Sequence, residues 1–132
     1  MNKFEFTYII DDDAIFVMVF KKILSNIESF EKIDTVKNGF EALEGLKLIH
    51  ERNEKFPDII FLDLNMPVLD GWQFLEAMEN LPFKDKLNIH VISSTINQDE
   101  IERSKTFKMV KSFIQKPTSA KQLIQSLGML PN

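Results

Sequence analysis

Five short apolar segments of the chain alternate with segments whose apolar residues recur at helical spacing. This alternation predicts an α/β fold, in which a mostly parallel five-stranded sheet is covered by five helices on both faces and joined by right-handed crossovers. The expected strands are Phe4–Ile10, Lys32–Val36, Asp58–Leu62, Asn88–Ile92 and Val110–Gln115. The expected helices are Ala14–Ile27, Phe40–Arg52, a segment after Asp70-Gly71 that carries Trp72, Leu75 and Met78, Asn97–Lys108 and Ala120–Leu127.

Length and composition limit the classes of protein that remain. A chain of 132 residues fits one domain, residues 1–132, and the last expected helix leaves no room for an output domain. A net charge of −4 argues against a nucleic-acid surface, which needs a basic face. The absence of cysteine excludes disulfides and fits a cytoplasmic protein. The longest apolar run, Ala14 to Phe20, is too short to cross a membrane.

Within the helices, the spacing also predicts which residues face the core. Phe16, Val19, Phe20, Ile23 and Ile27 fall on one face of the first helix, which we expect to pack on the sheet. We also expect Met18, Met78 and most of the phenylalanines to fill the core. Asp13 and Asn38 precede helices at positions where their side chains can cap the first turn, and Asp70 either forms a turn with Gly71 or starts a helix. His50 and His90 are expected to be structural or solvated residues, away from any reaction.

Acidic residues follow two of the expected strands directly. Asp11 and Asp12 come after the first strand, and Asp63 comes after the third. The carboxyl ends of strands line the ligand crevice in an open α/β sheet, so these carboxylates are expected to meet. Two of them about 4–8 Å apart repel by about 2–4 kcal/mol at an effective dielectric of about 20. Mg²⁺ would remove that repulsion, since it prefers oxygen ligands.

Two further polar groups belong to the same edge of the predicted sheet. Ser93 and Ser94 end the fourth strand, and Lys116 with Pro117 ends the fifth. A carboxylate can attack phosphorus, while a hydroxyl and an ammonium can stabilise the charge on the transferred oxygens. The set therefore indicates phosphoryl chemistry.

Four pieces of the sequence, in this order, resemble response-regulator receiver domains. They are Asp11-Asp12, Asp63-Leu64-Asn65-Met66-Pro67 with Asp70-Gly71, Ser93, and Lys116-Pro117. The resemblance covers residues 4 to 128 and implies a flavodoxin-like sheet with strand order 2-1-3-4-5. It implies a phospho-accepting switch of a two-component or phosphorelay system, supplied by a sensor histidine kinase or a histidine phosphotransfer protein. The output would be contact with an effector protein of unknown identity, without nucleic acid or membrane.

The resemblance also implies roles for individual residues. Asp63 would accept the phosphoryl group, with Lys116 paired to it. Mg²⁺ would be held by Asp11, Asp12, Asp63 and the backbone carbonyl of Asn65.

Three further expectations concern the switch and the fifth strand. Ser93 would donate to the phosphoryl group, and we prefer it to Ser94, which then falls at the family's small-residue position. Phe113 stands at the switch aromatic and, unlike the tyrosine often found there, has no hydroxyl. The Lys116-Pro117 bond would be cis.

Two other functions remain open from sequence. Asp11-Asp12-Asp13 after an apolar strand also fits the start of a haloacid-dehalogenase-like phosphatase, in which Asp11 would carry the phosphoryl group. That family needs a late acidic pair, and no Asp or Glu follows Glu102. The chain could also be a pseudo-receiver, an interaction module that takes no phosphate. The receiver reading predicts no enzyme activity beyond the phosphorylation and dephosphorylation of Asp63 itself.

Overall fold

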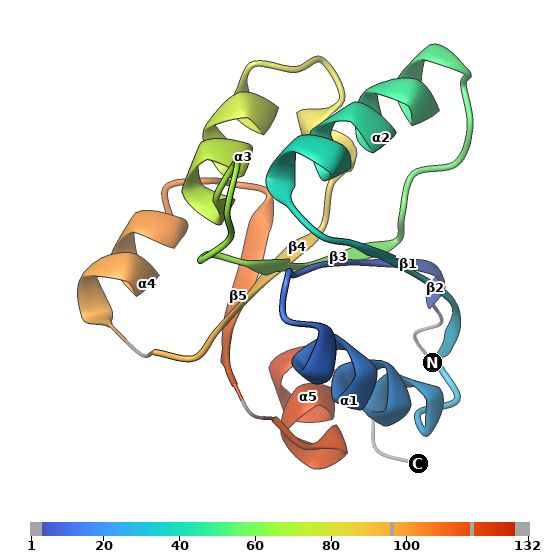
Figure 1. Ribbon diagram of the computed structural model, residues 1–132, viewed down its shortest axis with the longest axis vertical. Helices are drawn as coiled ribbons and strands as arrows, with labels where there is room; N and C mark the ends of the chain where they lie inside the picture. Colours follow the sequence, from blue (N-terminus) through green and yellow to red (C-terminus); the bar gives the residue numbers. More distant parts are fainter. Residues whose placement is uncertain (1–3, 96, 117, 129–132) are drawn as a thin grey trace.

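The computed structural model describes residues 4–95, 97–116 and 118–128 and contains a parallel sheet of five strands (Figure 1). The strand order is β2-β1-β3-β4-β5, as the resemblance to receiver domains implies. The order reverses beside β1, so the loops after β1 and β3 leave the sheet toward opposite faces and a crevice opens between them. The strands are β1 (Phe4–Ile10), β2 (Phe30–Val36), β3 (Ile59–Asp63), β4 (Ile89–Ser93) and β5 (Val110–Gln115).

Helices cover both faces of the sheet. In Figure 1, α1 and α5 lie on one face, α2 and α3 lie on the other, and α4 lies toward the β5 edge. The helices are α1 (Ala14–Ser25), α2 (Gly39–Glu51), α3 (Gly71–Glu79), α4 (Gln98–Ser104) and α5 (Ala120–Ser126), with a short 3₁₀ turn at Lys84–Lys86.

Each face of the sheet has its own apolar core. On the α1 and α5 side, Phe20 of α1 meets Phe61 of β3 edge to face, with ring centroids 4.9 Å apart. On the α2 and α3 side, Leu46, Phe74 and Met78 are fully buried against the strands. β1, β3 and β4 are covered on both faces, and for this reason their sequences are mostly apolar along the strand.

Polar side chains fix where the helices begin. Asp13 Oδ1 accepts a hydrogen bond from Phe16 N, and Asn38 Oδ1 accepts one from Glu41 N. Asp70 caps α3 through Gln73 N, and the Gln73 side chain accepts from Asp70 N in return. The predicted caps Asp13 and Asn38 are confirmed, and of the two roles expected for Asp70 the structure shows the helix start. The three caps fix the ends of the loops that follow β1, β2 and β3.

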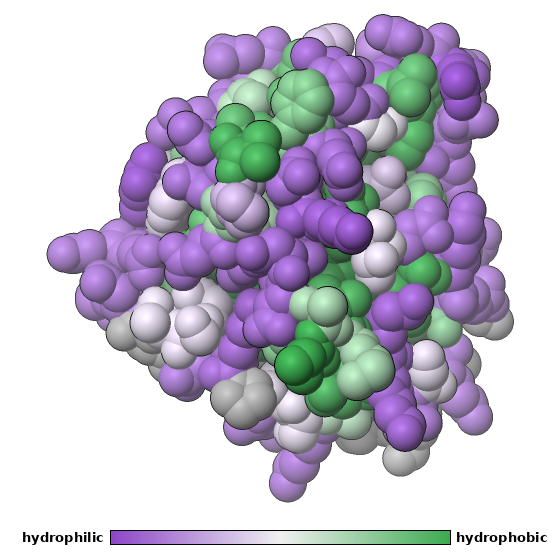
Figure 2. Space-filling view, in the orientation of Figure 1, coloured by the Kyte–Doolittle hydropathy of each residue, from purple (hydrophilic) through white to green (hydrophobic). Residues whose placement is uncertain are grey.

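Two packing predictions were wrong. Val19 and Met18 of α1 are 50% and 66% exposed. Phe40 of α2, which is 49% exposed, is an exception to the expectation that most phenylalanines fill the core. The reason is that α1 rests on the sheet through Phe20 and Leu24, which leaves Val19 on the flank and Met18 on the outside. Figure 2 shows apolar side chains gathered on the surface over this helix.

Helix ends also differ from the prediction. α1 ends at Ser25 instead of Ile27, and α4 ends at Ser104 instead of Lys108. After α4 the chain turns so that Phe107 and Met109 are buried in the core, and this requires the helix to stop. Among the described residues, no helix is long and apolar enough to cross a membrane.

Candidate functional site: an acidic cluster with a lysine

Three carboxylates meet at the carboxyl ends of β1 and β3. These strands are neighbours in register, with Ile10 opposite Leu62, so the residues that follow are brought side by side. Asp11, Asp12 and Asp63 each place one carboxylate oxygen within 4.8 Å of the others. The predicted clustering of residues 52 positions apart is therefore present in the fold.

The three carboxylates differ in their surroundings. The Asp11 side chain is fully buried, Asp63 is nearly so, and Asp12 is exposed. Asp11 Oδ1 accepts a hydrogen bond of 2.9 Å from Asp13 N at the start of α1. This contact orients the buried carboxylate, while Asp12 stays open to solvent and to an incoming group.

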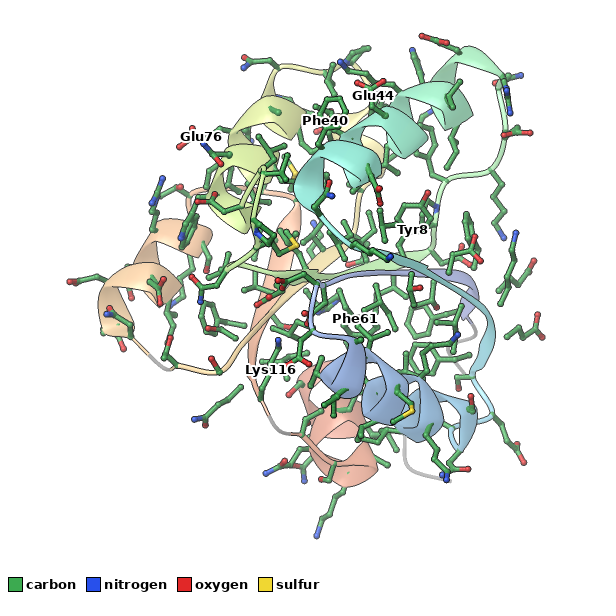
Figure 3. The ribbon with its side chains drawn as sticks, in the orientation of Figure 1. Tyr8, Phe40, Glu44, Phe61, Glu76 and Lys116 are labelled. Atoms are coloured by element: carbon green, nitrogen blue, oxygen red, sulfur yellow. The ribbon has the colours of Figure 1, made fainter. Side chains whose placement is uncertain are left out.

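Lys116 supplies the positive charge of the cluster. Its Nζ lies 2.8 Å from Asp11 Oδ2 and 3.6 Å from Asp63 Oδ1 (Figure 3). The backbone N–H of Lys116 donates to the carbonyl of Ser93 at 2.7 Å, which fixes the end of β5 beside β4. The Phe16 ring centroid lies 4.3 Å from the same ammonium, so an aromatic face covers it on the α1 side.

Burial raises the pKa of the Asp63 carboxyl to about 6, and the neighbouring Asp11 carboxylate adds to the rise. The Lys116 ammonium and a hydrogen bond from the Asn65 backbone act against that rise. A nucleophile must be ionised, so a bound cation that lowers this pKa would increase the reactive fraction of Asp63 at neutral pH.

The two candidate serines are clearly separated by the structure. Ser93 is fully buried, and its Oγ accepts from Thr95 N at 3.3 Å and lies 3.4 Å from Thr95 Oγ1. Ser94 is exposed. Ser93 ends β4 beside Asp63, because Asp63 pairs with Ile92 in the register of β3 and β4. The placement therefore favours Ser93 as the hydroxyl of the site.

The remaining predicted residues lie around this cluster. Asn65 is exposed in the loop after β3, and its backbone hydrogen-bonds the Asp63 carboxylate. Phe113 lies on β5 opposite Val91 and is partly exposed. Pro117, and with it the predicted cis bond, lies outside the described residues.

Sequence reasoning named two residues, Phe16 and Gly71, without predicting how they shape the site. Phe16 was assigned to the core, yet its ring lies over the Lys116 ammonium, and no sequence signal joins positions so far apart. Gly71 is the other, since a Cβ there would lie 2.7 Å from both Asp63 O and Leu64 Cα. The Asp70-Gly71 turn could have indicated this close approach, because glycine often marks such a place.

The cluster fits a divalent cation. Asp11 Oδ2 is buried and accepts no hydrogen bond among the described residues, although Lys116 Nζ lies 2.8 Å away as an ion-pair partner. Three carboxylates against one ammonium leave excess negative charge in a mostly buried place. Oxygen ligands at an incompletely compensated acidic site are what Mg²⁺ requires.

The fold and this site define the class of protein, a phospho-accepting domain with an acidic crevice at the switch point of a five-stranded parallel sheet. The family model described as the response regulator receiver domain matches residues 7–128. The chain belongs to this family, whose members act as signalling switches in two-component systems and bind Mg²⁺ at an acidic pocket.

Relatives and solved structures agree with this assignment. The chemotaxis protein CheY of Listeria monocytogenes is 31% identical over 119 residues, covering 90% of this chain and 92% of CheY. A protein-glutamate methylesterase/protein-glutamine glutaminase of Methanococcoides burtonii is 29% identical over 118 residues, and the match covers 89% of this chain but 31% of that protein. The chain thus spans less than a third of that relative. A two component response regulator from Cytophaga hutchinsonii superposes with a TM-score of 0.86 at 25% identity, covering 96% of both chains.

Proposed function

We propose that this chain takes a phosphoryl group from a phosphohistidine partner onto Asp63 and signals by protein contact. The partner would be a sensor histidine kinase or a histidine phosphotransfer protein. The observation that carries the proposal is the position of Lys116 Nζ, 3.6 Å from Asp63 Oδ1 and 2.8 Å from Asp11 Oδ2. One ammonium thus serves both the proposed acceptor and a proposed metal ligand.

The proposed chemistry is an in-line displacement. A carboxylate oxygen of Asp63 forms a bond to phosphorus, and the P–N bond to the donor imidazole breaks with its electron pair left on nitrogen. The Lys116 ammonium would pair with the Asp63 carboxylate before the transfer and with a phosphoryl oxygen after it. Mg²⁺, held by Asp11, Asp12, Asp63 and the Asn65 carbonyl, would supply compensation of charge when bound.

The proposed switch uses the end of β4 and the middle of β5. The Ser93 hydroxyl makes contacts of 3.3 and 3.4 Å with Thr95, which are long enough to exchange for a charged acceptor. Phe113 is only partly buried, so it can turn inward when the hydroxyl moves. The local charge event would then bias a two-state element formed by the last two strand–helix units.

The test is phosphorylation by a small donor. The full chain is incubated with Mg²⁺ and acetyl phosphate, and its intact mass is measured for wild type, Asp63→Asn and Asp85→Asn. We expect one phosphoryl adduct on wild type and on Asp85→Asn, an exposed acid outside the site, and none on Asp63→Asn. Omission of Mg²⁺ should remove the adduct.

The same measurement separates the alternatives. A phosphatase of the haloacid-dehalogenase type would place the phosphoryl group on Asp11, so the adduct would survive in Asp63→Asn. The full burial of the Asp11 side chain opposes that reading. A pseudo-receiver would show no adduct in any variant, and the complete set of acid, hydroxyl and lysine opposes this reading. We propose no further enzyme activity beyond turnover of the Asp63 adduct.

We further propose that the phosphohistidine partner docks on α1. Ile15 and Met18 are 73% and 66% exposed, and a groove of about 410 Å³ extends from Asp12 past Met18 to Lys21. A partner seated on this apolar face would present its histidine at the acidic cluster. Met18→Glu should slow transfer from a histidine phosphotransfer domain that labels wild type, while labelling by acetyl phosphate stays unchanged. Arg52→Glu, exposed at the far end of α2, is the charge control.

A further inference from the structure

The face of α2 turned away from the sheet carries two large apolar side chains. Phe40 and Leu48 are 49% and 43% exposed, and neither is among the buried residues that form the two cores. They lie eight positions apart, about 12 Å along the helix and about 80° apart around it. Glu44 lies midway between them and is exposed; Figure 3 labels Phe40 and Glu44 on this helix.

The same face is acidic. At about 100° per residue, Glu41, Glu44 and Glu51 fall within about 120° of arc together with the two apolar residues. All three glutamates are exposed, and within the described ranges none forms an ion pair or a side-chain hydrogen bond. Two basic residues, Lys47 and Arg52, flank this arc, each about 20° beyond one of its edges. The outer face of α2 therefore combines two apolar positions with three carboxylates, and a basic residue borders it on either side.

We propose that the outer face of α2 binds a basic amphipathic helix of a partner protein. The apolar side chains of that helix would cover Phe40 and Leu48, and lysine or arginine residues between and beside them would face Glu44, Glu41 and Glu51. This goes beyond the proposed function, because the face shares no residue with the acidic cluster or with the α1 groove. It gives the chain a second partner surface.

The charges distinguish this occupant from three others. In a symmetric dimer through antiparallel α2 helices, Phe40 would meet Leu48 of the other copy, and the midpoint would place Glu44 against Glu44. Like charges at the centre of an interface oppose such a dimer. The same carboxylates would repel nucleic acid and anionic lipid. A cationic protein segment satisfies both the charge and the apolar positions.

This face also borders the loop that follows Asp63. Gly39 N donates to Leu69 O at 3.1 Å, and a Cβ on Gly39 would lie 2.6 Å from that oxygen. Phe40 therefore lies directly after Gly39, whose backbone hydrogen bond ties the start of α2 to the loop between β3 and α3. Val68, which is 78% exposed, lies next to Leu69 on the other side of that contact. Figure 2 shows apolar side chains on the surface in this region.

The test uses nuclear magnetic resonance of the ¹⁵N-labelled full chain and three synthetic peptides. The first is an alanine-based helix with leucines at i, i+3 and i+7 and arginines beside them. The second replaces the arginines with glutamates, and the third is a scrambled basic peptide of the same composition. We expect the basic amphipathic peptide to shift amide signals of α2 and to bind about 10-fold tighter than the other two.

Variants locate the binding face. Phe40→Ser and Glu44→Lys should each weaken binding of the basic peptide by about 10-fold. Glu28→Lys, the same charge change at an exposed position before β2, should leave the affinity unchanged. All variants are first checked for a wild-type amide spectrum, because a loss of binding counts only in a folded chain.

Four results would overturn the proposal. They are no shift on α2, equal binding of the scrambled peptide, shifts confined to α1, and self-association in sedimentation that Phe40→Ser abolishes. The last would assign the face to a second copy of the chain. None of them depends on phosphorylation of Asp63, so failure here and failure of the proposed function are distinguishable.

Discussion

His90 should make the stability of this protein fall in mild acid. The side chain is 6% exposed on β4, with Nδ1 2.6 Å from Ser112 Oγ and Nε2 3.1 Å from Asn88 Oδ1. Asn88 Nδ2 donates to Asp58 O, so Asn88 Oδ1 remains as an acceptor. We therefore assign the proton of the neutral ring to Nε2 and the acceptor role to Nδ1. Both ring nitrogens are satisfied in the neutral form, whereas a second proton on Nδ1 would require the Ser112 hydroxyl to rotate from donor to acceptor.

The magnitude follows from the pKa. Burial, and then the Lys111 ammonium, lower the pKa of His90 from 6.5 to about 4. Between these values the unfolded chain binds a proton that the folded protein does not, so the free energy of unfolding falls as the pH falls. One unit of pKa is worth about 1.4 kcal/mol, so the full loss is about 3 kcal/mol. About 2 kcal/mol of it is lost between pH 7 and pH 5.

The assay is urea unfolding at pH 7 and pH 5 in EDTA, for wild type and His90→Gln. The glutamine amide can still donate to Asn88 and accept from Ser112, but it cannot be protonated. Asp63 contributes with the opposite sign, because its folded pKa is raised from 3.8 to about 6 and the folded state binds the extra proton. Comparing the two proteins cancels that contribution. Wild type should lose about 2 kcal/mol more than His90→Gln on acidification.

Equal losses in the two proteins, within about 0.5 kcal/mol, would refute the reasoning. The ring resonances of His90 offer a direct check. They should stay in the neutral form down to about pH 4, the value to which burial lowers the pKa of His90. Titration near pH 6.5 in the folded protein would show that the ring is not isolated from solvent as its contacts indicate.

Three further predictions concern the loops around the acidic cluster. Without metal, Asp12→Asn should raise the free energy of unfolding by up to about 1 kcal/mol, because it reduces the repulsion among the carboxylates. The same substitution should abolish the stabilisation by Mg²⁺ that thermal melts detect. A lower free energy of unfolding for the metal-free variant would contradict the clustering of the carboxylates. Val68 has φ +70° in a turn closed by a hydrogen bond from Leu69 N to Pro67 O. Asparagine tolerates this left-handed conformation better than valine, so Val68→Asn should raise the free energy of unfolding in urea by about 1 kcal/mol. No increase would mean that the turn is unstrained. Gly71→Ala should destabilise by about 1–3 kcal/mol in the same measurement, because its Cβ would clash with backbone; a neutral result would show that the loop can move aside.

The sequence pattern determined that the fold is a parallel α/β sheet and which chemistry the site carries, whereas the strand order was implied only by the resemblance to receiver domains. Successive strand segments are separated by helical segments, and a helix that connects two strands favours their parallel pairing. In a parallel sheet the carboxyl ends of all strands lie at the same edge. This is why Asp11, Asp12, Asp63 and Lys116 could be expected together. The caps Asp13 and Asn38 could also be predicted, because their side chains act on the backbone only three residues away.

Tertiary packing decided what local spacing leaves open. Helical periodicity gives an apolar arc but not the line along which the helix meets the sheet, so Val19 and Met18 were placed inside and are exposed. The choice between Ser93 and Ser94 depends on where β4 ends, because Ser93 is the last strand residue and pairs with Gln115 of β5, whereas Ser94 is exposed in the loop beyond it. The contact between the Phe16 ring and the Lys116 ammonium joins α1 to the residue after β5, 100 positions away in the sequence. No short-range signal specifies this contact, and only the folded sheet with its helices brings the two residues together.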